Sequence, residues 1–135
     1  MRAHLDFETY SEADLKKVGA WAYASHPSTE ILCMGLALDD KPVAVWKPAE
    51  LKTFIPLPPS LQFIAHNVQF EYAIWYFIMH LKHGWPALTD PARWDCTKAR
   101  ALTCGIPGSL EGAARALKTP FQKPRTRSTF VPAEK

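Results

Sequence analysis

The chain of 135 residues has no apolar run that approaches the roughly 20 residues a helix needs to cross a bilayer. Before its first acid, Asp6, it also lacks the apolar stretch of a signal peptide. We therefore expect a protein without a membrane partner, located in the cytoplasm.

Cysteine is scarce: Cys33, Cys96 and Cys104 are odd in number and form no C-x-x-C pair. This spacing is typical of free thiols in a reducing compartment. Disorder is not expected, because hydrophobic residues make up 47% of the chain and include five Trp and seven Phe. A net charge of +3 permits a nucleic-acid partner without indicating one.

Hydrophobic periodicity predicts alternating strands and helices. Alternation over 3–9 predicts a strand, and the apolar runs 31–38 and 43–46 predict an antiparallel hairpin, the first of them well buried. A short strand in mid-sheet is expected at 61–65. Helices are expected at 49–54, 69–81, 98–104 and 110–117, with a loop or short helix over 11–30 and a strand end at 93–95. This order predicts an α/β layer architecture.

The composition of the sequence changes at Lys118. From there on, prolines interrupt the hydrophobic periodicity, and five basic residues accompany one acid. We interpret 118–135 as a basic, proline-containing tail that is solvated, with phosphate contact as the alternative.

Two acid patterns are candidates for chemistry. Asp6 and Glu8 share one face of the first strand, roughly 6.5–7 Å apart, and would repel unless a hard cation such as Mg²⁺ lay between them. The alternative is a solvent-facing strand edge. Glu71 falls in the first turn of the helix after 61–65, at the carboxyl end of a strand, where α/β proteins bind ligands. Here the alternative is a helix-dipole contact, with Asn67 as an N-cap.

Together these residues resemble a known family. Asp6-Phe7-Glu8-Thr9 resembles the first motif of the DEDD-type 3′–5′ exonucleases, and Asn67-Val68-Gln69-Phe70-Glu71 resembles the second. The resemblance covers residues 3 to about 117 and is strongest to the proofreading domains of phage family A DNA polymerases. The stretches that carry the phage resemblance are 14–19, 26–32, 65–67 and 108–111.

The resemblance implies an RNase H-like fold, a mixed sheet with an N-terminal antiparallel hairpin flanked by helices, over a partial exonuclease domain at 1–117. It implies two-metal hydrolysis with Mg²⁺ or Mn²⁺. Asp6 would bridge both ions, Glu8 would hold one, and Glu71 would hold the other, often through water. Many relatives have Asp where this chain has Glu71.

The implied substrate is the 3′ end of single-stranded DNA. Asn67 would touch that end, and Thr9 and Phe70 would help seat the terminal nucleotide. Other implied partners are a polymerase module or further replication proteins, in a bacterial host cell and encoded by a phage or prophage.

The family's third motif, a Tyr or His closely followed by Asp, is missing. After Asp95 the sequence contains no Asp, His or Tyr, and its remaining acids are Glu111 and Glu134. A second ion would then be weakly held. Two alternatives to an active enzyme follow: a catalytically impaired nucleic-acid-binding module, or a gene fragment.

Other residues have simpler interpretations. Asp95 is expected to cap the next helix rather than to act in catalysis. His80 and His83 could form a zinc site with Cys96 or Cys104, but two polar residues at a helix end suit the spacing better. Trp75 is expected in the core, although it could stack bases together with Tyr76 and Trp85.

Overall fold

The computed structural model describes residues 1–52 and 56–120. Most of the expected tail, 118–135, and the end of the helix expected at 49–54 therefore lie outside the described residues. In the described part, no helix is both long and apolar enough to cross a membrane.

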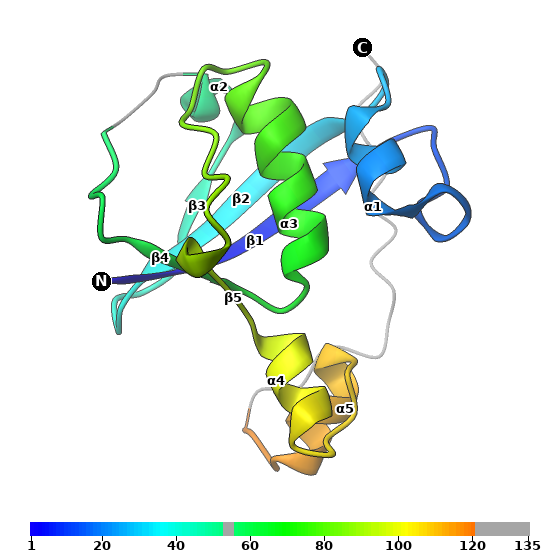
Figure 1. The fold of residues 1–135 in the computed structure, drawn as a ribbon, viewed down its shortest axis with the longest axis vertical. Helices are drawn as coiled ribbons and strands as arrows, with labels where there is room; N and C mark the ends of the chain where they lie inside the picture. Colours follow the sequence, from blue (N-terminus) through cyan, green and yellow to red (C-terminus); the bar gives the residue numbers. More distant parts are fainter. Residues whose placement is uncertain (53–55, 121–135) are drawn as a thin grey trace.

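A five-stranded mixed sheet with the order β3-β2-β1-β4-β5 forms the centre of the molecule (Figure 1). β1 pairs antiparallel with β2, and β2 pairs antiparallel with β3, which confirms the expected hairpin. β4 and β5 extend the other side of β1 in parallel. The strands are β1 (Arg2–Tyr10), β2 (Glu30–Leu38), β3 (Ala44–Trp46), β4 (Gln62–Ala65) and β5 (Trp94–Cys96).

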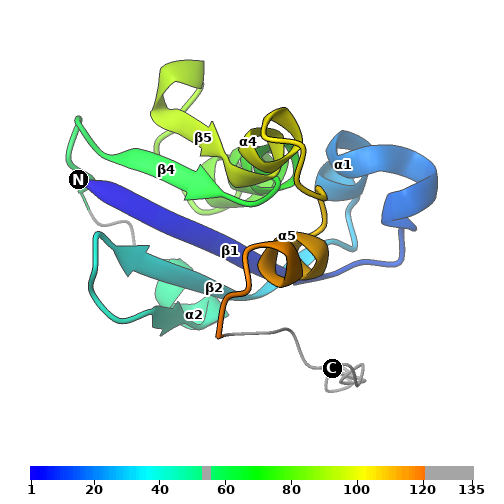
Figure 2. The same ribbon diagram turned by 90° about the horizontal axis from the view of Figure 1, so that it is seen from below.

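Helices pack against one side of this sheet, and two more lie over part of the other side. The helix α3 packs against β1, β4, β5 and α1 on one side, while α4 and α5 lie in front of the sheet in the view of Figure 2. The helices are α1 (Leu15–Ser25), α2 (Pro48–Leu51), α3 (Val68–Ile74) with its π-helical continuation η1 (Trp75–His80), the 3₁₀ turn η2 (Pro91–Arg93), α4 (Thr97–Thr103) and α5 (Leu110–Ala116). The predicted α/β architecture is confirmed.

The core lies between β1 and α3. Ala3, Leu5 and Phe7 point into it, as the alternation of β1 requires. Trp75 is 2% exposed and occupies the centre, as predicted. Its ring contacts come from four aromatic residues, Phe7, Phe63, Trp85 and Trp94.

Two local expectations were wrong. In β2 only Ile31 and Met34 are buried, and the other apolar residues of the strand are partly exposed. Asp95 does not cap α4. The N-cap is Cys96, whose sulfur accepts from the Ala99 amide, while the Asp95 carboxylate accepts a 2.9 Å hydrogen bond from Arg100.

Trp75→Phe should destabilise the fold by roughly 1–3 kcal/mol, because it removes buried ring volume and the 2.7 Å bond from Nε1 to the Pro86 carbonyl. The same substitution at Trp21, which is 54% exposed, is the matched control and should cost under about 1 kcal/mol. Urea unfolding of both variants measures the difference. Equal losses would contradict the placement of Trp75 at the centre of the core.

Candidate functional site

The outer face of β1 carries the first acid pair. Asp6 and Glu8 are both exposed and point away from the buried side chains of the strand, as the alternation predicts. The pairing of β1 with β2 shifts register between Glu8 and Thr9. Such a bulge twists a strand and redirects the side chains that follow it, and bulges are frequent beside active sites.

Glu71 approaches the pair from α3. It lies in the first turn of that helix, is 4% exposed, and its Oε2 atom has no hydrogen-bond partner among the described residues. Burial, then the charge of Asp6, and to a smaller degree that of Glu8, raise the pKa of Glu71 to about 7. Hydrogen bonds from the backbone amides of Glu71 and Phe7 act in the opposite direction.

Cys33 belongs to the same electrostatic environment, since it pairs with Glu8 across the sheet. Burial, followed by the charges of Glu8 and Asp6, raises the pKa of its thiol. Burial is the first cause of both shifts, and the charges of Asp6 and Glu8 act on both groups in the same direction.

These acids do not form a finished coordination group. Within residues 1–52 and 56–120, no three His, Cys, Asp or Glu side chains are arranged to hold a metal ion. The donor chemistry fits nevertheless, because carboxylate oxygens are the ligands that Mg²⁺ and Mn²⁺ prefer, and the buried Oε2 of Glu71 lacks a partner in the part of the chain that the structure describes. The three acids thus have the ligand type that a hard divalent cation prefers. Their side chains are not arranged as a metal-binding group in the described residues.

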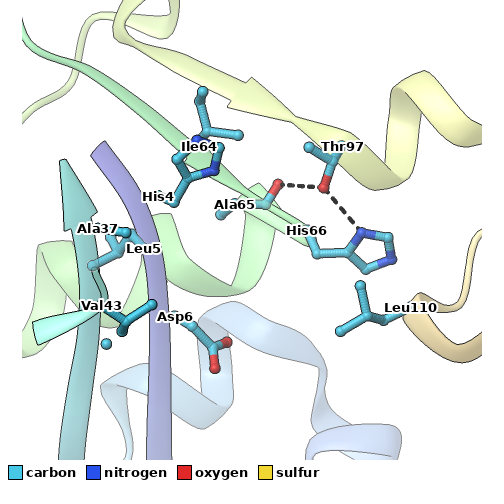
Figure 3. A pocket seen from close by; sticks show the side chains of 11 residues that line it. His4, Leu5, Asp6, Ala37, Val43, Ile64, Ala65, His66, Thr97 and Leu110 are labelled. Atoms are coloured by element: carbon cyan, nitrogen blue, oxygen red, sulfur yellow. Dashed lines mark hydrogen bonds between the residues drawn. The ribbon is translucent and has the colours of Figure 1, made fainter. Parts of the chain in front are cut away.

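A hollow of about 410 Å³ lies on the outer face of the sheet, beside Asp6. Figure 3 shows Asp6 on one side of it and His66, Thr97 and Leu110 on the other. The His66 ring donates through Nε2 to the Gly108 carbonyl (2.8 Å) and lies 3.0 Å from the Thr97 hydroxyl. His66 therefore ties the end of β4 to α4 and to the loop before α5, which fixes that wall of the hollow.

The residues expected to contact substrate gather around a buried tyrosine. The Thr9 and Tyr23 hydroxyls lie 2.8 Å apart, and the half-buried Phe70 ring packs 5.9 Å from Tyr23. Asn67 occupies the N-cap position of α3, but its exposed side chain makes no capping bond. The expected N-cap position is thus confirmed, although without a capping bond from the side chain, and the exposed amide can reach a ligand.

Other candidates have separate partners. Glu111 is exposed and pairs with Arg115 at 2.7 Å, and Glu134 lies outside the described residues. His80 donates through Nδ1 to the Trp85 carbonyl. Burial, followed by the charges of Lys52 and Lys82, lowers the pKa of His83.

Sequence reasoning missed the roles of His66 and Tyr23 in holding this region together. His66 immediately precedes Asn67 at the end of a buried strand, a position that could have marked it. Nothing in the sequence near Tyr23 signals its contact with Thr9.

Glu71→Gln should remove a pH dependence of stability. An unfolded Glu has a pKa of about 4.3, whereas folding raises that of Glu71 to about 7. Between these values only the folded state holds the proton, so this contribution to stability is lost as pH rises through about 7.

From about pH 5 to about pH 8 in metal-free buffer, the original chain should lose roughly 2–3 kcal/mol relative to Glu71→Gln. Urea unfolding of both proteins across that range measures the difference. Parallel stability profiles would show that Glu71 ionises normally.

Comparison with known proteins gives a relative. No protein-family model and no solved structure matches the chain. It is 35% identical over 133 residues to a DNA polymerase of Bacillus phage SP02, and the alignment covers 94% of this chain and 20% of that polymerase. The chain thus spans about a fifth of the length of this relative. Over nearly its whole length, it is similar to one region of a phage DNA polymerase.

Proposed function

We propose that this chain is the exonuclease region of a phage-type DNA polymerase, with an RNase H-like fold, and removes nucleotides from single-stranded DNA 3′ ends. The observation that carries the proposal is the buried Glu71 carboxyl group, with one oxygen that has no partner among residues 1–52 and 56–120 and with the charges of Asp6 and Glu8 acting on it. The similarity to a DNA polymerase supports it independently.

Asp6, Glu8 and Glu71 would hold Mg²⁺ or Mn²⁺. When bound, the ions would stabilise the charge of the scissile phosphate and lower the pKa of the attacking water. The carboxylates of Asp6 and Glu8 would attract the cations, and the buried position of Glu71 would limit competition from bulk water.

Substrate positioning falls to residues at the start of α3. The exposed amide of Asn67 would hydrogen-bond the terminal nucleotide. Phe70, backed by Tyr23, would provide an apolar surface for the terminal sugar and base, with Thr9 beside it. Contacts of this kind fix the strand so that the last phosphodiester faces the acids.

A catalytically impaired nucleic-acid-binding module is the second candidate. It is favoured by the ion pair of Glu111 with Arg115, because the only acid beyond Asp95 in the described residues is thereby engaged. Without a third-motif residue to orient water, the rate should fall about 10²–10⁴-fold below that of a complete site. A fragment of a longer polymerase would have the same deficit.

Incubation of the chain with a 5′-labelled single strand and Mn²⁺ should give a slow 3′-to-5′ ladder. Asp6→Ala should reduce the rate at least about 100-fold, because it removes a carboxylate from the proposed metal site. Asp40→Asn, an exposed acid in the turn after β2, is the matched control and should leave the rate unchanged. A ladder that persists in Asp6→Ala would exclude the assigned site.

The binding module is distinguished by a readout that needs no catalysis. Mn²⁺ should raise the melting temperature of the original chain at about pH 8 and have little effect on Glu71→Gln. Stabilisation by Mn²⁺ and retained DNA binding, with no ladder, would favour the impaired module. A melting temperature of the original chain that does not change when Mn²⁺ is added would contradict a metal site at Glu71.

A further inference from the structure

A second hollow, of about 560 Å³, opens beside the start of α3. Figure 1 shows α1 beside α3 and β5 below the first turn of α3. The residues that form its lining come from these elements and from the loop before β5. They are Trp21, Val68, Gln69, Tyr72, Thr89, Pro91, Trp94 and Cys96. We call this hollow the aromatic pocket.

Trp21 is an exposed ring held in a fixed position. Its side chain is 54% exposed, whereas Trp75 and Trp85 are each 2% exposed. Its ring stacks on Tyr76 with 5.5 Å between centroids and meets the edge of Phe77 at 4.6 Å. An exposed aromatic side chain fixed by neighbours loses little conformational entropy when a flat ligand stacks on it.

The other rings define a flat-sided site. Tyr72 lies nearly parallel to Trp21, at 20° and 6.4 Å, and meets Trp94 edge-on at 79° and 5.8 Å. Trp94 donates its indole N–H to the Leu88 carbonyl, which fixes the far wall and leaves its ring as apolar surface. Parallel and perpendicular faces of this kind suit a planar ring better than a branched aliphatic side chain.

Polar groups at the rim could read the edge of such a ring. Gln69 and Thr89 both line the pocket and are exposed, and they supply an amide and a hydroxyl. Gln69 lies between Asn67 and Glu71, so the first turn of α3 borders both the acids and the aromatic pocket. A strand whose end lies at the acids would therefore pass close to this pocket.

We propose that the aromatic pocket binds a nucleobase of the single strand, upstream of the terminal nucleotide, by stacking on Trp21. The proposal rests on the single-stranded DNA substrate proposed above and adds a subsite remote from the acids. Stacking on an aromatic side chain is tolerant of base identity, because every base has a π-face. The subsite would hold the strand without selecting a sequence.

Affinity should depend on the Trp21 ring. With a fluorescein-labelled oligothymidylate in EDTA, anisotropy should show about tenfold weaker binding for Trp21→Ala. Trp21→Phe keeps a stacking face and should stay within about threefold of the original chain. Gln69→Ala should also weaken binding, without removing a core contact. Leu81 lies outside the pocket and is about as exposed as Trp21, so Leu81→Ala should leave the affinity unchanged.

Photo-crosslinking locates the base directly. Oligonucleotides with 5-iododeoxyuridine at successive positions from the 3′ end should crosslink to Trp21 or Tyr72 from an internal position, as mapped by mass spectrometry. Crosslinks elsewhere, or equal affinity of Trp21→Ala and the original chain, would overturn the proposal. Failure of the original chain to bind the oligonucleotide would also overturn it. The same holds if only free iododeoxyuridine monophosphate, and not the oligonucleotide, crosslinks to these residues.

The anisotropy assay contains EDTA, so it measures binding independently of hydrolysis. The cleavage ladder is measured separately, with Mn²⁺. Trp21-dependent binding without a cleavage ladder would support base binding at the aromatic pocket and contradict the proposed exonuclease activity. If the original chain gives a ladder, and Trp21→Ala changes neither the ladder nor the affinity, the exonuclease proposal would be supported and the aromatic pocket rejected as a subsite.

Discussion

The carboxyl group of Glu71 is buried where α3 packs against β1, and the surrounding structure has to offset the free energy of placing it there. Burial and the charge of Asp6 both disfavour its ionised form and raise its pKa to about 7, at about 1.4 kcal/mol for each pKa unit. Two backbone amides offset part of this cost, while Oε2 has no partner in the described residues. A proton relieves the remaining cost, and at the proposed metal site a divalent cation would relieve it as pH rises.

The position of Glu71 in turn depends on the register of β1. This strand is central, and its alternation sends Ala3, Leu5 and Phe7 into the core and Asp6 and Glu8 to the other face. A slip of one residue would bury both acids and expose the apolar set, so the core fixes the place of the acids. The same contacts that stabilise the fold therefore fix two carboxylates on β1 and a third in the first turn of α3, where the charges of Asp6 and Glu8 act on it.

The parts of this arrangement that arise from local patterns could be predicted from the sequence. Alternation predicted β1, turn residues predicted the β2–β3 hairpin, and the position of Glu71 in a first helical turn followed from the strand before it. The contacts of His66 with Thr97 and Gly108 join residues 31 and 42 positions apart, and no local pattern encodes such pairings. Asp95 was wrongly expected to cap α4, because helix onset shifts by one residue to Cys96 and Arg100 reaches back to the carboxylate. The RNase H-like assignment stays a prediction, since the five-stranded mixed sheet establishes only the broader architecture.

Metal binding and hydrolysis make different demands on this chain. A cation needs carboxylate oxygens, and the burial of Glu71 beside Asp6 provides a thermodynamic reason for one to bind. Hydrolysis also needs a group that orients water, and in the described residues the only acid after Asp95, Glu111, is paired with Arg115. Apolar side chains stand near the hollow beside Asp6, with Val43 66% and Leu110 57% exposed, so this face retains surface that further polypeptide could cover. The chain spans 20% of the phage polymerase that it resembles, and under the proposed exonuclease function no fourth ligand is evident among the described residues. Under the proposed function, the three acids would account for cation binding, whereas efficient hydrolysis would also require a group that orients water.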